Sequence, residues 1–226
     1  MAKILLLNPN KWGRGITHIW IATHSSILKK KTNQVELFDC TFFSDWTDNE
    51  VEYATGTGMF KPTEYSKFIK YKNISIIEEL QKKIDSFKPD IIFWSALSSH
   101  IHSKGEYVNI QNGHDLLNQV NSQKALKITG GLQATAAPEL TLNNFKTIDY
   151  LIRGESELVL ANIADSLDKG LDFSEVEGIT YLKNNKIKNT KNQKIISDLD
   201  ILSPYDYDIF DDQVFLRPYN GELVRA

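Results

Sequence analysis

The segment KILLLNPN, residues 3–10, decides the fold class. Four consecutive bulky aliphatic residues, from Ile4 to Leu7, run directly into a turn, which is typical of a strand buried on both faces, as parallel strands are. Four more short apolar runs follow along the chain, and we expect each to be a strand. They lie at 35–38, 91–94, 125–129 and 150–152.

Helical periodicity separates these runs. Apolar residues recur at three- and four-residue steps and their multiples, which indicates helices with one face against a sheet. The positions are Ile16, Ile19, Trp20 and Ile27, then Ile77, Leu80, Ile84 and Phe87, then Leu116, Leu117 and Val120, and finally Val159, Ile163 and Leu167. Strands alternating with helices predict an α/β fold with a doubly wound, mostly parallel, five-stranded sheet, covered by helices on both faces.

The character of the chain changes after Gly170. Residues 177–183 and 186–191 flank Asn184-Asn185, which predicts a β-hairpin with a type I′ turn. Residues 197–226 predict an irregular extension rather than a second core. We therefore expect an α/β domain at 1–170 and a hairpin with a connector at 171–226. The aromatic-rich insertion at 41–73 is either a lid or a satellite core.

Composition excludes several classes of protein. The formal net charge is −3 with both signs interspersed, so no basic footprint for nucleic acid exists. One cysteine, Cys40, excludes an internal disulfide framework, a cysteine-ligated zinc site and an iron–sulfur cluster held by this chain. No apolar stretch reaches the roughly 18 residues that span a bilayer, and none near the start resembles a secretory signal. We expect a cytoplasmic protein with no membrane partner.

Ligands of open parallel sheets bind beyond the carboxyl ends of the strands, where the strand order reverses. Small and polar residues follow the predicted strands at 8–14, 95–102, 130–135 and 153–155. Glycines there would let a ligand approach the backbone, although glycines after strands also serve simply to make tight turns. Several of them on one edge favour a binding site.

Four of these segments carry a family resemblance. They are Lys3-Ile4-Leu5-Leu6-Leu7-Asn8-Pro9, Lys88-Pro89-Asp90-Ile91-Ile92, the Gly-Gly…Pro-Glu segment 130–139 and the Arg-Gly-Glu-x-Glu segment within 149–157. Together they resemble the N-terminal cobalamin-binding domain of cobalamin-dependent radical SAM enzymes over residues 1 to about 170. Residues 177–217 resemble the connector of that family towards its catalytic barrel. The resemblance implies a flavodoxin-like or Rossmann-like sheet.

Cobalamin domains of the methionine synthase and mutase type carry Asp-x-His-x-x-Gly after strand one, Ser-x-Leu after strand three and Gly-Gly after strand four. Here Ser95-Ala96-Leu97 and Gly130-Gly131 match the last two motifs. The first stands as residues 8–13, Asn-Pro-Asn-Lys-Trp-Gly, with the spacing kept and both functional residues changed. Because a carboxamide is a poor ligand for cobalt, Asn10 cannot replace histidine as a strong lower ligand.

The resemblance implies a corrin lying across the carboxyl edge of the sheet, with residues 8–13 under its lower face. Its nucleotide tail would run between sheet and helix past Gly130 and Gly131, with Ser95 hydrogen-bonding the base. Trp12 either packs on the corrin or is a core aromatic. The implied cofactor-binding residues are Asn8, Pro9, Asn10, Lys11, Trp12, Gly13, Ser95, Ala96, Leu97, Ser98, Gly130, Gly131, Leu132, Gln133, Thr135, Gly154 and Glu155.

Radical SAM chemistry needs a Cys-x-x-x-Cys-x-x-Cys motif, which this chain lacks. The four-iron four-sulfur cluster and S-adenosylmethionine implied for the parent enzyme are therefore not bound here, and we expect no catalysis from this fragment alone. The chain stops shortly before such a motif is expected, so it is either an excised N-terminal domain or a stand-alone protein. The tail has little apolar material of its own, which favours excision. Its partners would be a radical SAM catalytic domain in the same protein and a small-molecule substrate of a methyltransferase-like reaction.

Alternatives remain open. The altered first motif and the aromatic insertion also suit a degenerate cobalamin-like domain with a structural or substrate-recruiting role and no bound corrin. A nucleotide-using Rossmann enzyme is disfavoured, since the first turn has only Gly13 and Gly15 instead of Gly-x-Gly-x-x-Gly. His100 and His102 lack an identifiable third zinc ligand. His18 and His24 are expected simply to line a helix face. The acidic residues between 198 and 212 predict a docking surface or a solvated segment.

Overall fold

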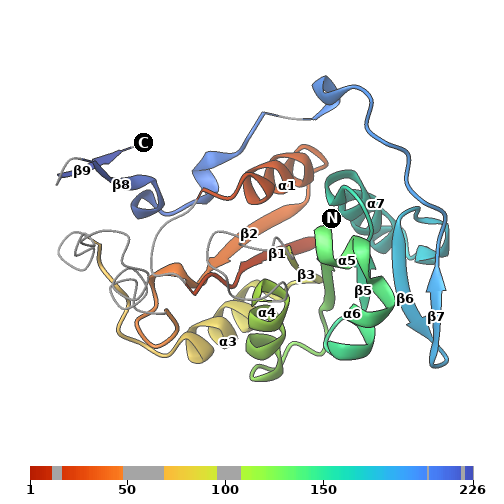
Figure 1. Cartoon of the computed structure of the whole chain (residues 1–226), viewed down its shortest axis with the longest axis horizontal. Coiled ribbons are helices and arrows are strands. Elements are labelled where there is room, and N and C mark those ends of the chain that lie inside the picture. Colours follow the sequence, from red (N-terminus) through yellow and green to blue (C-terminus); the bar gives the residue numbers. More distant parts are fainter. Residues whose placement is uncertain (12–16, 48–68, 96–107, 203, 220–221, 226) are drawn as a thin grey trace.

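The computed structural model describes residues 1–11, 17–47, 69–95, 108–202, 204–219 and 222–225 (Figure 1). The expectations for Trp12, Gly13, residues 96–98, the His100–His102 pair and most of the 41–73 insertion lie outside these residues. The helices are α1 (Ile19–Lys30), α3 (Ile76–Phe87), α4 (Val108–Asn118), α5 (Leu132–Ala136), α6 (Pro138–Asn144) and α7 (Ser156–Asp168). The strands are β1 (Lys3–Asn8), β2 (Gln34–Asp39), β3 (Ile91–Ser95), β4 (Leu126–Gly130), β5 (Tyr150–Ile152), β6 (Ile179–Lys183), β7 (Lys186–Asn189), β8 (Leu216–Tyr219) and β9 (Glu222–Arg225).

The main sheet has the strand order β2-β1-β3-β4-β5-β6-β7. Strands β1 to β5 are parallel, as predicted, and each is one of the apolar runs read from the sequence. The expected count of five strands is wrong. Strand β6 pairs antiparallel with β5, and β7 pairs antiparallel with β6, so the sheet has seven strands. The reason is that β5 has a free edge, and Ile179 and Thr180 of β6 are buried where they cover it.

The turn between β6 and β7 follows the chemistry read from the sequence. Asn184 and Asn185 have φ angles of 54° and 58°. A type I′ turn requires positive φ at both central residues, and asparagine tolerates that region better than most residues. These two strands do not stand apart from the α/β sheet but extend it.

The sheet is buried on both faces. Along β1, Ile4 and Leu6 belong to a core shared with α1 and α7, whereas Leu5 and Leu7 belong to a second core shared with α3 and α4. Figure 1 shows α1 and α7 on one side of the sheet and α3 and α4 on the other. This two-sided burial explains why β1 is apolar at four consecutive positions rather than at alternate ones.

Helix α1 departs from the predicted apolar stripe. Ile19 is 59% exposed, whereas Ile21, Ala22, Ser25 and Leu28 are buried. The buried face includes small and polar residues, which an apolar periodicity does not detect. Within the predicted stripe, Ile27 is buried and Trp20 packs against the same core, so among the described residues the prediction is wrong at Ile19.

The C-terminal segment is not wholly irregular, which corrects a second expectation. It makes short 3-10 turns at Leu199–Ile201, Tyr207–Ile209 and Asp212–Phe215, and then the antiparallel pair β8–β9. Phe210 and Val214 are buried in the α1/α7-side core.

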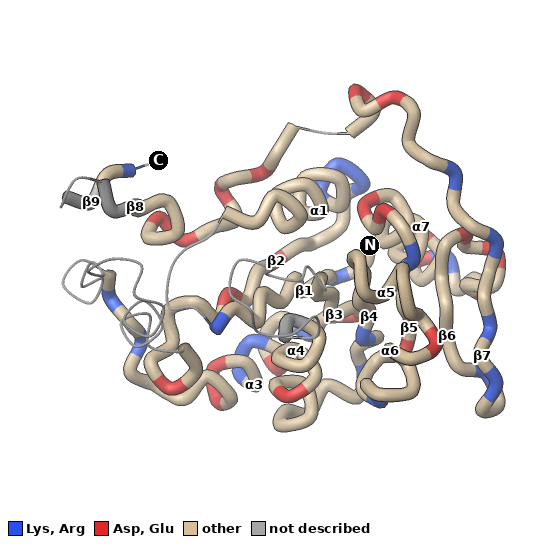
Figure 2. Tube along the Cα trace, viewed as in Figure 1, with Lys and Arg blue, Asp and Glu red and all other residues tan. Residues whose placement is uncertain are grey.

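Asp206 fastens this segment to α1. Its N–H donates to the carbonyl of Ala22 at 3.2 Å, and its carboxylate accepts from Ser25 Oγ and Lys29 Nζ, each at 2.6 Å. Burial alone raises the pKa of Asp206, but the hydrogen bonds from Lys29, Ser25 and the Asp208 backbone, together with the charge of Lys29, hold the pKa below its ordinary value. The segment after β7 thus folds back over α1 (Figure 2). None of the helices in the described part of the chain has both the length and the apolar character that crossing a bilayer requires.

Candidate functional site

Three of the predicted site residues end neighbouring strands on the same face of the sheet. Residues two positions earlier, Leu6, Phe93 and Ile128, all belong to the α1/α7-side core. Because side chains alternate along a strand, Asn8, Ser95 and Gly130 face the same side. Ser95 is paired in register with Gly130, and Asn8 with Asp39 of β2. We call Asp39, Asn8, Ser95 and Gly130 the edge row. It crosses the point between β1 and β3 at which the strand order reverses, where ligands of open sheets bind.

Hydrogen bonds fix the amides of the first motif. Asn8 Nδ2 donates to Asp39 Oδ1 at 3.0 Å, and Asn10 Nδ2 donates to Thr41 Oγ1 at 3.0 Å. The Thr41 hydroxyl in turn donates to Asp39 Oδ1 at 2.5 Å. Both asparagines are buried. The two altered positions of the motif are therefore joined through one carboxylate and one hydroxyl.

Asp39 is the buried acid at the centre of this network. Burial raises the pKa of its carboxyl group, and the hydrogen bonds from Thr41 and Asn8 only partly oppose that effect. Its Oδ2 atom is buried and has no hydrogen-bond partner among the described residues. Sequence reasoning missed Asp39, although its position directly after a predicted strand was a usable signal.

Pro9 and Lys11 connect this edge to other segments. The carbonyl of Pro9 accepts a hydrogen bond from Asn112 Nδ2 of α4 at 3.3 Å. Lys11 Nζ lies 4.5 Å from the centre of the Trp46 ring, at the start of the aromatic insertion. A cation over an indole ring is a stabilising contact. The loop after β1 is thus tied both to α4 and to the segment after β2.

A single hydroxyl joins the two glycine turns of the site. Thr135 Oγ1 accepts from the N–H of Gly154 at 2.8 Å and donates to the carbonyl of Gly131 at 2.9 Å. Gly131 has φ 103° and ψ −173°, a conformation that residues with a Cβ atom hardly adopt, and Gly154 has φ 82°. Leu132 is 64% exposed beside them, and Glu155 is also exposed. Gln133 is partly buried.

The space below Ser95 and Gly130 is filled by the protein itself. His24 of α1 stacks on Phe93 with ring centroids 4.9 Å apart, and its Nε2 lies 2.9 Å from Ser156 Oγ of α7. His24 Nδ1 lies 2.6 Å from the carbonyl of Trp20, so Nδ1 carries the proton and Nε2 accepts from Ser156. Burial lowers the pKa of His24, while the charge of Glu157 opposes the shift.

Gly130 lies directly against this group. A Cβ atom added at Gly130 would lie 3.2 Å from Ser156 Cβ and 3.4 Å from Ser156 Oγ. The absence of a side chain at Gly130 is therefore explained by the close approach of α7. On the side of the sheet that faces α7, Ser156 therefore fills the space beside Gly130 in which we expected the nucleotide tail to run. Sequence reasoning placed His24 on a helix face but missed its partner Ser156, which is 132 residues away.

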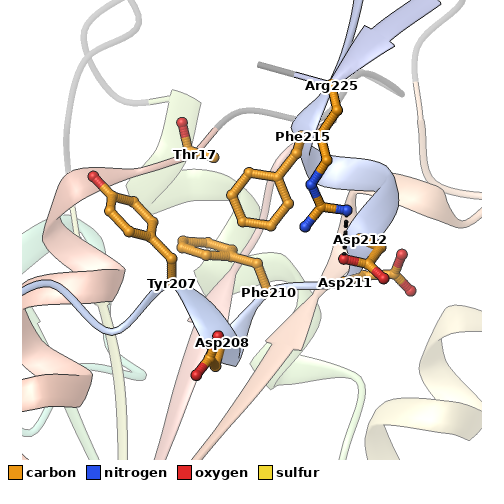
Figure 3. Close-up of a pocket in the computed structure, with 8 residues that line it drawn as sticks. All are labelled: Thr17, Tyr207, Asp208, Phe210, Asp211, Asp212, Phe215 and Arg225. Carbon is orange, nitrogen blue, oxygen red and sulfur yellow. Dashed lines mark ion pairs between the residues drawn. The ribbon is translucent and has the colours of Figure 1, made fainter.

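A separate hollow of about 850 Å³ lies between the C-terminal segment and the start of α1 (Figure 3). Its lining residues are Thr17, Tyr207, Asp208, Phe210, Asp211, Asp212, Phe215 and Arg225. Figure 3 shows the rings of Tyr207, Phe210 and Phe215 around the space, and Arg225 Nη1 pairs with Asp212 Oδ1 at 2.9 Å. The negative charge of Asp211 adds a small contribution to the raised pKa of Asp39.

Metal ligands are not clustered in the described part of the chain. Within those residues, no group of three or more His, Cys, Asp or Glu side chains is arranged to hold a metal ion. Cys40 is buried, and burial raises the pKa of its thiol well above the ordinary value.

Comparison with known proteins finds relatives that are similar to part of the chain and solved structures that share its fold. No protein-family model matches the chain. A 131-residue stretch is 28% identical to an uncharacterized methyltransferase of Pyrococcus horikoshii, covering 58% of this chain and 27% of that protein. The same degree of identity over 131 residues links it to the anaerobic magnesium-protoporphyrin IX monomethyl ester cyclase of Cereibacter sphaeroides, covering 56% of this chain and 20% of the cyclase. The chain spans about a quarter or less of these relatives.

Solved structures share the fold. The radical S-adenosylmethionine methyltransferase TsrM of Kitasatospora setae, solved with tryptophan and a SAM analogue, matches with a TM-score of 0.62 and 14% identity. That match covers 84% of this chain and 30% of TsrM. The cobalamin-dependent radical enzyme OxsB, solved with aqua-cobalamin and S-adenosylmethionine, matches with a TM-score of 0.57 and 17% identity, covering 95% of this chain and 25% of OxsB. The architecture of this chain is therefore that of a part of these larger enzymes.

Proposed function

We propose that this chain is a cobalamin-binding module of a radical SAM enzyme with a methyltransferase-like reaction. One observation carries the proposal: the edge row brings Asn8, Ser95 and Gly130 together at the reversal point of a sheet. Solved enzymes that share this fold include one with aqua-cobalamin bound. Ser95 and Gly130 match the family motifs, and Asn8 stands at the position where the first motif has aspartate.

The residues at the sheet edge are better suited to packing against the corrin ring than to coordinating a metal ion. Leu132 is exposed beside two glycine turns, and the glycines allow close approach to the backbone. When bound, cobalamin supplies the cobalt chemistry, and the protein positions the cofactor. Asn10 donates its amide N–H to Thr41, so this position orients the loop under the ring and supplies no strong ligand to the lower face.

The rest of the parent enzyme belongs to the same proposal. Residues 1–170 would form the cofactor domain, and residues 171–226 the hairpin and connector towards a catalytic domain. That catalytic domain would hold the four-iron four-sulfur cluster and S-adenosylmethionine and would complete the site for a small-molecule substrate.

Retention of hydroxocobalamin tests the proposal. The protein is mixed with the cofactor and desalted, and the visible spectrum is recorded. We expect corrin absorbance to stay with the folded protein. Leu132→Asp introduces a charge beside the proposed corrin, and we expect it to weaken retention about tenfold. Leu171→Asp is the matched control because Leu171 is similarly exposed, at 57%, but follows the far end of α7.

Two results would overturn this proposal. One is a folded protein, judged by circular dichroism, that retains no corrin absorbance. The other is equal weakening by the two leucine variants, which would remove the link between cofactor and sheet edge.

A second candidate is a degenerate domain with a structural or substrate-recruiting role. The closure of the space beside Gly130 by Ser156 favours it. It predicts no corrin retention together with tight association with the separately produced catalytic half, so the same samples discriminate the two functions.

A further inference from the structure

The face of the sheet below the edge row is the one along which a nucleotide tail would descend. In this structure, Trp20, His24 and Ser156 occupy that face. The Trp20 ring meets Phe93 edge-on at 5.8 Å, and the His24 ring lies flat on Phe93 at 4.9 Å. Since Phe93 lies two residues before Ser95 on the same face, these rings stand directly below Ser95.

Hydrogen bonds hold the side chains of His24 and Ser156 in place on this face. His24 is hydrogen-bonded to the carbonyl of Trp20 at one ring nitrogen and to Ser156 at the other, at 2.6 and 2.9 Å. Ser156 in turn limits the space at Gly130, where even a methyl group would approach it to 3.2 Å. We call His24, Ser156 and Gly130 the α1–α7 seam.

We propose that the site binds the corrin ring while the nucleotide arm stays outside the α1–α7 seam. This inference rests on the proposed function and widens its ligand class from cobalamin to corrinoids in general, including cobinamide, which lacks the nucleotide. Threading a benzimidazole past Gly130 requires breaking the His24–Ser156 hydrogen bond and separating His24 from Phe93. Binding of the ring at the edge requires neither change. The nucleotide therefore adds little to affinity.

The dissociation constants of aquacobalamin and diaquacobinamide, measured side by side by absorbance titration, test this inference. For the unaltered protein we expect the two values to agree within about threefold. The variant His24→Ala/Ser156→Gly removes the imidazole and the hydroxymethyl group from the seam. We expect it to bind cobalamin at least tenfold more tightly than cobinamide, because the arm then gains a cavity.

The control is His114→Ala. His114 lies on α4 at the opposite face of the sheet, where it is hydrogen-bonded to Thr147 Oγ1 at 2.8 Å and meets Phe145 edge-on at 5.4 Å. Its loss should leave the ratio of the two affinities unchanged. If the double variant does not fold by circular dichroism, Ser156→Gly alone serves, with the same direction of change.

The outcomes separate the two proposals. A tenfold or greater preference for cobalamin in the unaltered protein overturns the inference and leaves the proposed function standing. An opened variant that still binds both corrinoids equally also overturns it, since the seam would not be what excludes the arm. Binding of neither corrinoid to the folded protein defeats the proposed function, and the inference with it.

Discussion

Gly113 provides a direct test of how tightly α4 is packed against the sheet. This residue lies inside α4, and a Cβ atom added there would lie 2.6 Å from Trp94 Nε1 and 2.7 Å from Trp94 Cδ1. Distances this short require the ring or the helix to move, and Trp94 is fully buried. Gly113→Ala therefore has two opposing effects on stability. Alanine gains about 1 kcal/mol of helix propensity over glycine, while overpacking of a core costs about 1–3 kcal/mol.

The crowding should win, because three atoms of a buried ring lie within 3.0 Å of the new methyl group. We expect Gly113→Ala to lower the free energy of unfolding by about 2 kcal/mol, near the upper end of the overpacking range after the propensity gain is subtracted. For a chain of this size, the melting temperature should fall by about 4–8 °C. Urea unfolding followed by circular dichroism measures the change.

A double-mutant cycle with Trp94→Leu isolates the cause. In that background the clash is absent, so Gly113→Ala should become neutral or stabilise the protein by up to about 1 kcal/mol. Stabilisation of the otherwise unaltered protein by Gly113→Ala would refute the packing argument.

Three further predictions concern the edge row, the histidines His18 and His24, and the C-terminal segment. Asn8→Ala removes a hydrogen bond to the buried Asp39 carboxylate and should cost about 1–3 kcal/mol in urea unfolding, and an unchanged midpoint would contradict the network. Burial lowers the pKa of His18 to about 4 and also lowers that of His24, so the unfolded chain binds more protons below pH 6.5. The unfolding free energy should therefore fall as pH drops from 6.5 towards 5, by up to about 1.4 kcal/mol per pH unit for each histidine, and His24→Phe should reduce that slope. Asp206→Asn weakens the contact with Lys29 and should speed proteolytic cleavage between 199 and 215, whereas Asp200→Asn, on an exposed residue, should not.

The strands were predictable because burial on both faces leaves a local signal. Residues 150–152 form β5 with the same bounds as the apolar run. Helices α5 and α6 were missed, since five and seven residues are too few to show a helical period. The attachment of β6 to β5 depends on a pairing distant in sequence, which no local pattern records.

The candidate site was predictable in position but not in packing. Asn8, Ser95 and Gly130 could be placed at one edge because the ends of parallel strands meet there. The reason for a glycine at position 130 could not be inferred from its sequence neighbours, because the side chain that leaves no room for a Cβ atom there is that of Ser156 in α7. His24 shows the same limit, since its burial and partner arise only when α1 and α7 come together.

The edge strand β7 affects whether the protein aggregates at high concentration. An open strand edge offers unpaired amide and carbonyl groups to any neighbouring chain, which promotes aggregation. Here Lys186 and Lys188 lie on that strand, and both are exposed. Figure 2 shows positive charge along β7. Two copies that met through this border would bring like charges together and would have to strip water from them. We therefore expect concentrated solutions to remain free of fibrils. Replacement of both lysines by valine should promote association of two copies through β7.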